Sequence, residues 1–117
     1  MKSIRILLLT IPALALLASV SFAQEGNVAK GKAYFNDPKF AGGKSGSSCN
    51  TCHPNGKGLE KAGEKGRTSW KNPGGTWLSL EDTNNVCIMM ALKGKTIDPR
   101  GQEMKDLNAY IKSLAKK

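Results

Sequence analysis

The sequence predicts a small all-α domain in which three main helices are joined by loops. Three segments repeat apolar residues at the helical period, and each is bounded by residues that start or stop helices. The stretches between them are rich in Gly, Pro and Lys, and none shows the alternation expected of a strand. A chain of 117 residues also suits a single domain rather than two.

The N-terminal segment 1–23 is expected to be a cleaved signal peptide. Lys2 and Arg5 precede an almost wholly apolar stretch over 6–20, and a small-x-small cleavage site ends at Ala23. The apolar stretch is short for a membrane span. We therefore expect an exported protein, in the periplasm or an equivalent compartment, with no membrane span after cleavage.

The expected mature domain, 24–117, is small and basic. Cleavage would remove two of the 18 Lys and Arg residues and none of the 9 acids, so the net charge would fall from +9 to about +7. A positive surface steers acidic partners toward it, and we expect acidic proteins as partners. The basic residues are scattered, and an exported chain rarely meets nucleic acid, so no nucleic-acid binding is expected.

The first helix is predicted over 27–36. Its small and apolar positions, close to a 3.6-residue period, are Val28, Gly31, Ala33, Tyr34 and Phe35. Asp37 precedes Pro38, and the residue before a proline avoids the α region, so the helix should end here. Gly31 lowers helix stability, and close approach of another helix would explain its presence.

The pentapeptide Cys49-Asn50-Thr51-Cys52-His53 has the C-x-x-C-H pattern of covalent haem c attachment. The two thiols become thioethers on the haem, and the histidine reaches the iron as its proximal ligand. A zinc site needs about four ligands, yet the chain has one further cysteine, carboxylates and no second histidine. A redox disulfide would need a βαβ context that is absent. We therefore predict one covalent haem, which would also enlarge the core of a small chain.

The segment from 54 to 77 is expected to be irregular. Glycines interleaved with lysines predict a loop around the cofactor. Between Trp70 and Trp77, the residues Lys71-Asn72-Pro73-Gly74-Gly75-Thr76 predict a turn. Either indole could pack on the haem, hydrogen-bond a propionate or fill the core.

The second main helix is predicted over 80–92, with Ser79 as its N-cap. One face of this helix should carry Thr83, Cys87, Met90 and Ala91. Met89 should point elsewhere, and Gly94 is expected as the residue that follows the helix end. The third helix, over 101–114, has an apolar stripe made of Met104, Leu107, Tyr110, Ile111 and Leu114.

Together these features resemble a class I cytochrome c. The resemblance covers 24–117 and rests on Gly31 and Phe35 in the first helix, the C-x-x-C-H motif after it, and the last helix from Leu107 to Leu114. It implies the class I cytochrome c fold, in which helices and loops wrap around one haem. It also implies that the first and last helices cross at a small residue and an aromatic one.

The C-terminal part is similar to the haem domains of thiosulfate dehydrogenases and, more distantly, of SoxA proteins. The matching stretches are Val86-Cys87, Ala91-Leu92-Lys93-Gly94-Lys95, Gln102-Glu103-Met104 and Ala109-Tyr110-Ile111. In those relatives a cysteine at the position of Cys87 is the distal iron ligand. The size and layout also resemble the small NaxL and NaxS cytochromes of anammox bacteria. That resemblance implies a heterodimer with a related small cytochrome and, if it holds, the anammoxosome as compartment.

The residues themselves leave the distal ligand open. Cys87 is the third cysteine and has no disulfide partner once Cys49 and Cys52 carry the haem. It could be a buried free thiol, or a thiolate whose pKa iron has lowered. Met90 and Met89 are the alternatives, although the usual methionine ligand comes from an extended loop. Met104 fits the core better than the iron. The remaining possibilities for the distal position are a lysine such as Lys93, an open site or a residue from a partner chain. We predict Cys87.

The predicted function is electron transfer by a monohaem c-type cytochrome, with no enzymatic activity. An anionic thiolate favours Fe(III), so the redox potential should be low. Reduction weakens the bond from iron to sulfur, and a departing Cys87 would open a position for NO or CO. One alternative is a conventional electron carrier with His/Met ligation. Another is a subunit of a sulfur-oxidising haem enzyme, although such chemistry usually recruits a second haem.

Overall fold

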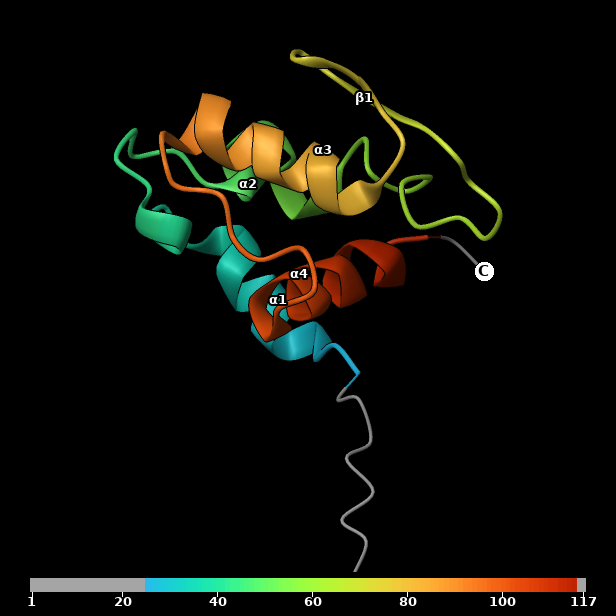
Figure 1. Cartoon of the computed structure of the whole chain (residues 1–117). Helices are drawn as coiled ribbons and strands as arrows, with labels where there is room; N and C mark the ends of the chain where they lie inside the picture. Colours follow the sequence, from blue (N-terminus) through green and yellow to red (C-terminus); the bar gives the residue numbers. More distant parts are fainter. Residues whose placement is uncertain (1–24, 116–117) are drawn as a thin grey trace, which may run out of the picture.

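The computed structural model describes residues 25–115, so the predicted signal peptide lies outside the described residues. This range forms four α-helices and one two-stranded sheet, with short 3₁₀ and π segments between them (Figure 1). The prediction of a mostly helical domain is therefore confirmed, whereas the expectation of no strands is wrong. None of the helices over 25–115 is long and apolar enough to cross a membrane.

Helix α1 (Val28–Asn36) and helix α4 (Gln102–Ser113) lie against each other although they are far apart in sequence (Figure 1). A Cβ at Gly31 would collide with the carbonyl of Asp106, so the two backbones touch at the glycine. One helical turn further on, Phe35 and Tyr110 pack edge to face, with ring centroids 5.0 Å apart. The expected close approach of a second helix at Gly31 is thus confirmed.

The predicted boundaries and core stripe of these two helices agree with the structure. Asn27 caps α1 by accepting a hydrogen bond from the Lys30 amide at 2.9 Å. The stripe of α4 is buried at Met104, Leu107, Tyr110 and Ile111, and half-buried at Leu114. The carboxylate of Asp106 is buried as well, and it accepts hydrogen bonds at 2.7 Å from the Asn27 amide and from the Gln102 side chain.

Between α1 and the motif, the chain makes a 3₁₀ turn η1 (Phe40–Gly42) and a loop. Phe40 is buried and stacks on Tyr34, with ring centroids 4.8 Å apart. The motif then forms the short helix α2 (Cys49–Cys52), followed by the 3₁₀ turn η2 (Pro54–Gly56). The apolar contacts of Phe40 therefore fix where this connection begins.

The segment that was expected to be a plain turn forms an antiparallel hairpin of β1 (Trp70–Asn72) and β2 (Gly75–Trp77). Trp70 faces Trp77 across the pair, and aromatic residues favour strands and cross-strand contact. Three residues a strand are too few to show an alternating pattern, which explains why the sequence predicts the turn and not the strands.

The second main helix consists of α3 (Leu80–Cys87) and a π-helical segment η3 (Ile88–Leu92). Ser79 caps it as predicted, accepting from the Asp82 amide at 3.0 Å. The left-handed residue at its end is Lys93, with a φ of 55°, and not Gly94. Gly94 is needed for another reason, because a Cβ there would lie 2.8 Å from the Ala41 carbonyl oxygen.

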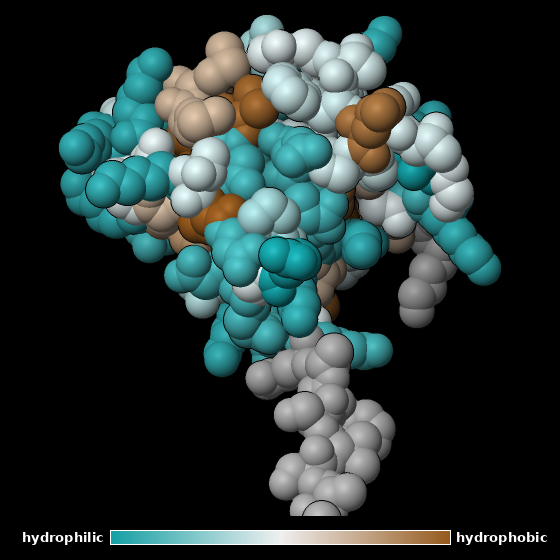
Figure 2. All heavy atoms as spheres, in the orientation of Figure 1, coloured by the Kyte–Doolittle hydropathy of each residue, from teal (hydrophilic) through white to brown (hydrophobic). Residues whose placement is uncertain are grey.

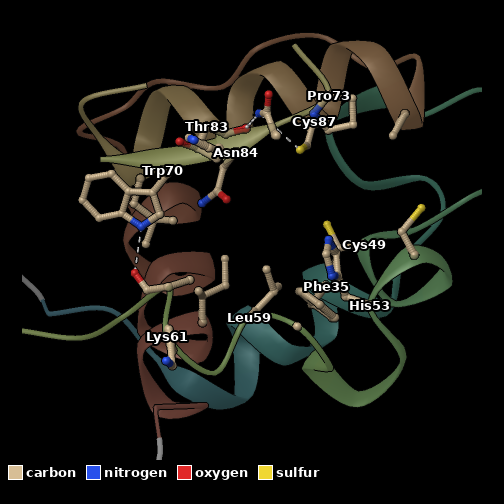
Figure 3. A pocket seen from close by; sticks show the side chains of 18 of the residues that line it. Phe35, Cys49, His53, Leu59, Lys61, Trp70, Pro73, Thr83, Asn84 and Cys87 are labelled. Carbon is tan, nitrogen blue, oxygen red and sulfur yellow. Dashed lines mark hydrogen bonds between the residues drawn. The ribbon is translucent and has the colours of Figure 1, made fainter. Parts of the chain in front are cut away.

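The helices enclose a cavity between two walls. We call α1, α2 and α4 with the loop up to Leu59 the lower wall, and α3, η3 and the hairpin the upper wall, as oriented in Figure 3. Most of the surface visible in Figure 2 is hydrophilic, and the hydrophobic residues there form small separate groups. The apolar side chains of both walls therefore gather inside the molecule, around the cavity.

Candidate functional site

The cavity between the two walls has a volume of about 730 Å³. This volume lies in the range of small-molecule and cofactor sites in proteins. Figure 3 shows side chains from both walls pointing into it. The apolar lining residues are Phe35, Leu59, Ala62, Trp70, Pro73, Leu80, Ala91, Leu92 and Ile111. The cavity is therefore an apolar chamber of the size that a cofactor needs.

All four predicted cofactor-binding residues line this cavity, namely Cys49, Cys52, His53 and Cys87. The first three come from α2 and the residue after it, and Cys87 ends α3 on the facing wall. Figure 3 shows Cys87 and His53 on opposite sides of the open space, with Cys49 beside His53. The fold thus brings together residues that are more than thirty positions apart in the sequence.

The two middle residues of the motif hold it in place. Thr51 accepts a hydrogen bond from the Ser48 amide at 2.9 Å, as part of a capping box at the start of α2. Asn50 accepts from the Asn55 amide at 2.8 Å, which ties α2 to the turn behind it. Both cysteines are therefore presented from a short helix whose ends are fixed locally.

The imidazole of His53 is oriented by the backbone that follows it. Its Nδ1 lies 3.0 Å from the carbonyl oxygen of Lys57. Since a carbonyl can only accept, Nδ1 must carry the proton and donate it. The other nitrogen, Nε2, is then unprotonated in the neutral ring, with a lone pair available for a metal. Metal-ligating histidines commonly have this arrangement.

The thiol of Cys87 sits in a half-buried position at the end of α3. Burial raises its pKa, while a hydrogen bond from Asn72 acts in the opposite direction. The Nδ2 of Asn72 donates to the Cys87 Sγ over 3.6 Å. Burial also raises the pKa of Cys49 to about 11, and the negative charge of a Cys87 thiolate adds to that rise.

Neither Met89 nor Met90 lines the cavity, so the prediction that Met90 shares a face with Cys87 is wrong. The two side chains are 46% and 49% exposed. Met90 points to the hairpin turn, because a Cβ on Gly74 would lie 3.0 Å from the Met90 Sδ. The π-helical winding of η3 explains the difference. Its wider turns bring Leu92 to the cavity beside Ala91, which was expected there, and rotate Met90 away from it.

The other two candidates for the distal position also lie away from the cavity. Met104 is fully buried in α4, which confirms that it is a core residue. Lys93 is exposed and left-handed at the end of η3. Of the side chains considered for the distal position, Cys87 is the one that the fold brings to the cavity wall.

The rim of the cavity carries positive charge. Lys61, Arg67 and Lys71 line it, together with the single acid Glu60. The indole of Trp70 donates to the Ala62 carbonyl at 2.8 Å, which closes the loop that bears Lys61. The Arg67 guanidinium lies 6.0 Å from the centroid of the Trp70 ring. This part of the rim suits a ligand with anionic groups.

Three features of the site were not predicted, namely the Asn72 amide, the Lys57 carbonyl and Asn84. Asn84 lines the upper wall, and its Nδ2 donates to Asn108 Oδ1 at 2.7 Å. The turn signal at Asn72 could have indicated that its side chain accepts a hydrogen bond from a backbone amide two residues later. Nothing in the sequence indicates that the Nδ2 of Asn72 contacts the sulfur of Cys87, fifteen residues later.

The side chains that could bind a metal here suit a metal that is already held in the plane of a ring. Over residues 25–115, no three His, Cys, Asp or Glu side chains cluster as a bare metal ion would require. Two single donors, an imidazole and a thiol, instead face each other across an apolar chamber. Two further thiols, those of Cys49 and Cys52, also line it. A haem needs one or two axial donors, and its thioether links need two thiols. The residues present therefore fit haem c.

Comparison with known proteins finds no matching protein family, no similar curated protein and no similar solved structure.

Proposed function

We propose that this protein is a monohaem c-type cytochrome of class I fold that transfers electrons, with His53 and Cys87 as the axial residues. The observation that carries the proposal is the placement of His53 and Cys87 on facing walls of one apolar cavity, with Cys49 and Cys52 at its edge. The crossing of α1 and α4 at Gly31 and Phe35 supports the fold assignment, because the class I resemblance implies such a crossing.

Each residue of the cavity would have a distinct part in holding the haem. Cys49 and Cys52 would tether it covalently, and His53 would present the lone pair of Nε2. Lys61, Arg67 and Lys71 would place positive charge near the propionates. The haem itself would supply the one-electron couple between Fe(III) and Fe(II). The apolar lining would exclude water from it.

The proposal includes a low redox potential. A thiolate at Cys87 carries a negative charge, and this charge stabilises Fe(III) more than Fe(II). The surroundings of Cys87 favour the neutral thiol, since burial raises its pKa. The thiolate would therefore depend on the iron for its stability, and it would be held less firmly after reduction.

A second candidate function is the binding of NO or CO in the reduced state. It is favoured by the wall next to Cys87, where Ala91 and Leu92 line the cavity with small and apolar side chains. If protonated Cys87 moves away, these residues would leave an apolar space for a diatomic gas. A reduced protein that remains fully six-coordinate under CO would contradict this second function.

The partners and the compartment are part of the proposal. Electron exchange would occur with acidic redox proteins, drawn by the basic surface and weakened by salt. The extracytoplasmic location follows from the predicted signal peptide at 1–23, and a heterodimer with a related small cytochrome follows from the sequence resemblance.

The test is electron paramagnetic resonance and visible spectroscopy of the oxidised holoprotein, compared with Cys87→Ala. We expect a low-spin thiolate signal of small anisotropy that the substitution abolishes, together with a rise in midpoint potential. Met90→Ala is the matched control, because Met90 lies on η3, which directly continues α3, but outside the cavity. A methionine charge-transfer band that survives in Cys87→Ala and disappears in Met90→Ala would assign the ligand to Met90. Failure to attach haem would reject the function as a whole.

A further inference from the structure

The side chain of Asn72 makes four hydrogen bonds that join the hairpin to α3. Its Oδ1 accepts from the Gly74 amide at 2.8 Å and from the Trp77 indole at 2.9 Å. Its Nδ2 donates to the Thr83 carbonyl at 3.1 Å and to the Cys87 Sγ over 3.6 Å. One amide therefore connects the turn, the opposite strand, the helix backbone and the proposed distal ligand.

The orientation of this amide follows from its partners. A backbone amide and an indole N–H can only donate, so the oxygen of Asn72 must face Gly74 and Trp77. The carbonyl of Thr83 can only accept, so the nitrogen must face α3. A flipped amide would place like groups together at three of the four contacts. The group directed at Cys87 is thus a hydrogen-bond donor.

We propose that Asn72 is a positioning residue that holds the Cys87 thiolate toward the haem and tunes its donation to iron. The inference rests on the proposed His/Cys ligation and adds to it the residue that controls the ligand. The Asn72 amide acts through Cys87 and does not itself touch the iron. The hairpin, which the sequence predicted only as a turn between two tryptophans, becomes the support that carries this amide.

The physical effect of the hydrogen bond has a definite sign. An N–H donor withdraws electron density from a thiolate sulfur, and such bonds to charged groups are about twice as strong as neutral ones. Weaker donation to iron favours Fe(II) relative to a thiolate without the bond. Hydrogen bonds to ligating sulfurs and to axial ligands are known levers on redox potential. Asn72 should therefore keep the potential higher than the thiolate alone would allow.

The fold gives the amide little freedom to move. Two strands of three residues are marginal by themselves. Trp70 packs against the core and Trp77 bonds to Asn72, so the hairpin is fixed on both sides. The sulfur consequently meets a donor that is already oriented before any ligand is bound.

The experiment compares midpoint potentials and resonance spectra of four holoproteins: the unsubstituted chain, Asn72→Ala, Asn72→Asp and Trp77→Phe. Asn72→Ala removes the donor without adding a charge. Asn72→Asp keeps the oxygen that Gly74 and Trp77 need, but it replaces the donor that faces Cys87 with an oxygen whose negative charge also lowers the potential. Trp77→Phe removes one bond to Asn72 and leaves the donor in place. In Asn72→Asp we expect the ratio of reduced to oxidised protein at a fixed potential to fall further than in Asn72→Ala, in which we expect a fall of about tenfold. This fall corresponds to about 59 mV for one electron.

The outcomes separate this inference from the function beneath it. A thiolate signal in the unsubstituted protein with an unchanged potential and unchanged spectra in both Asn72 variants would overturn the role of Asn72 alone. A fall of equal size in Trp77→Phe would assign the effect to hairpin packing and would overturn it too. The absence of a thiolate signal in the unsubstituted protein would instead reject the His/Cys ligation.

Discussion

The lower and upper walls of the cavity are stabilised in different ways. In the lower wall, α1 and α4 touch through backbone at Gly31 and through the rings of Phe35 and Tyr110. The upper wall also buries apolar residues and is joined to the preceding loop by backbone bonds from Lys44 and Ser45 to the Leu92 carbonyl, but asparagine side chains add directional bonds that the contact of α1 with α4 at Gly31 and Phe35 lacks. Asn72 joins the hairpin to α3 within the upper wall, while Asn84 bonds to Asn108 and Asn85 to Ile97 outside it.

The difference indicates how each axial residue is controlled. Close packing is non-directional, and it makes the lower wall a rigid support for the motif. Amide hydrogen bonds are directional. Small changes in such a bond alter the position and the charge density of the ligand atom that accepts it. We therefore expect stability to depend most on the lower wall, and the properties of the distal ligand to depend most on the upper wall.

The largest effect is expected from preventing cofactor attachment with Cys49→Ser and Cys52→Ser together. An apolar cavity of about 730 Å³ would lose its contents, and ligands that bind the folded state stabilise it by several kcal/mol. Hydrogen exchange with mass spectrometry should show fast exchange throughout α3 and slower exchange in α1 and α4. Equal protection of both walls in the haem-free chain would contradict the comparison.

The next effect concerns the lower wall alone. Gly31→Val would push a side chain into the Asp106 backbone, and such overpacking should cost about 3 kcal/mol or more in the free energy of unfolding. Urea denaturation of the holoprotein measures it. Lys32→Ala, at an exposed neighbouring position of the same helix, is the control and should change stability by less than about 0.5 kcal/mol. If Gly31→Val leaves the free energy of unfolding unchanged, α1 and α4 can move apart to make room for the side chain.

A smaller effect is expected in the upper wall. Asn85 is buried, and its side chain makes two hydrogen bonds with the backbone of Ile97, at 2.9 and 3.0 Å. Asn85→Ala would leave both backbone groups without these partners, at a cost of about 2 kcal/mol. Thermal unfolding measures the change, and the exposed Thr96→Ala is its control. A larger loss than that of Gly31→Val would reverse the ranking of the two walls.

The helices could be predicted because their signals are local. Asn27 and Ser79 begin helices that the structure confirms, and Asp37 before Pro38 ends one. The burial of Met104 followed from the stripe of α4. These features depend on residues within one or two turns of each other, which is the range that periodicity and capping describe.

The features that could not be predicted depend on distant contacts. The π-helical winding after Cys87 changes which residues face the cavity, and it removed Met90 from the predicted face. An α-helical projection of the sequence assumes a constant turn and cannot register such a change. Likewise, Asn72 indicates a turn, but its bond to the Cys87 sulfur depends on how the hairpin lies against α3.

The hydrogen bond from His53 to the Lys57 carbonyl affects how this protein could be altered by mutation or by design. The acceptor belongs to the main chain, so every amino acid at position 57 supplies it. What the histidine orientation requires is the number of residues between the ring and that carbonyl. A scan of substitutions at Lys57 should therefore be tolerated, whereas deletion of one residue between 54 and 57 should misdirect the ring. The spacing carries information here that the side chains do not.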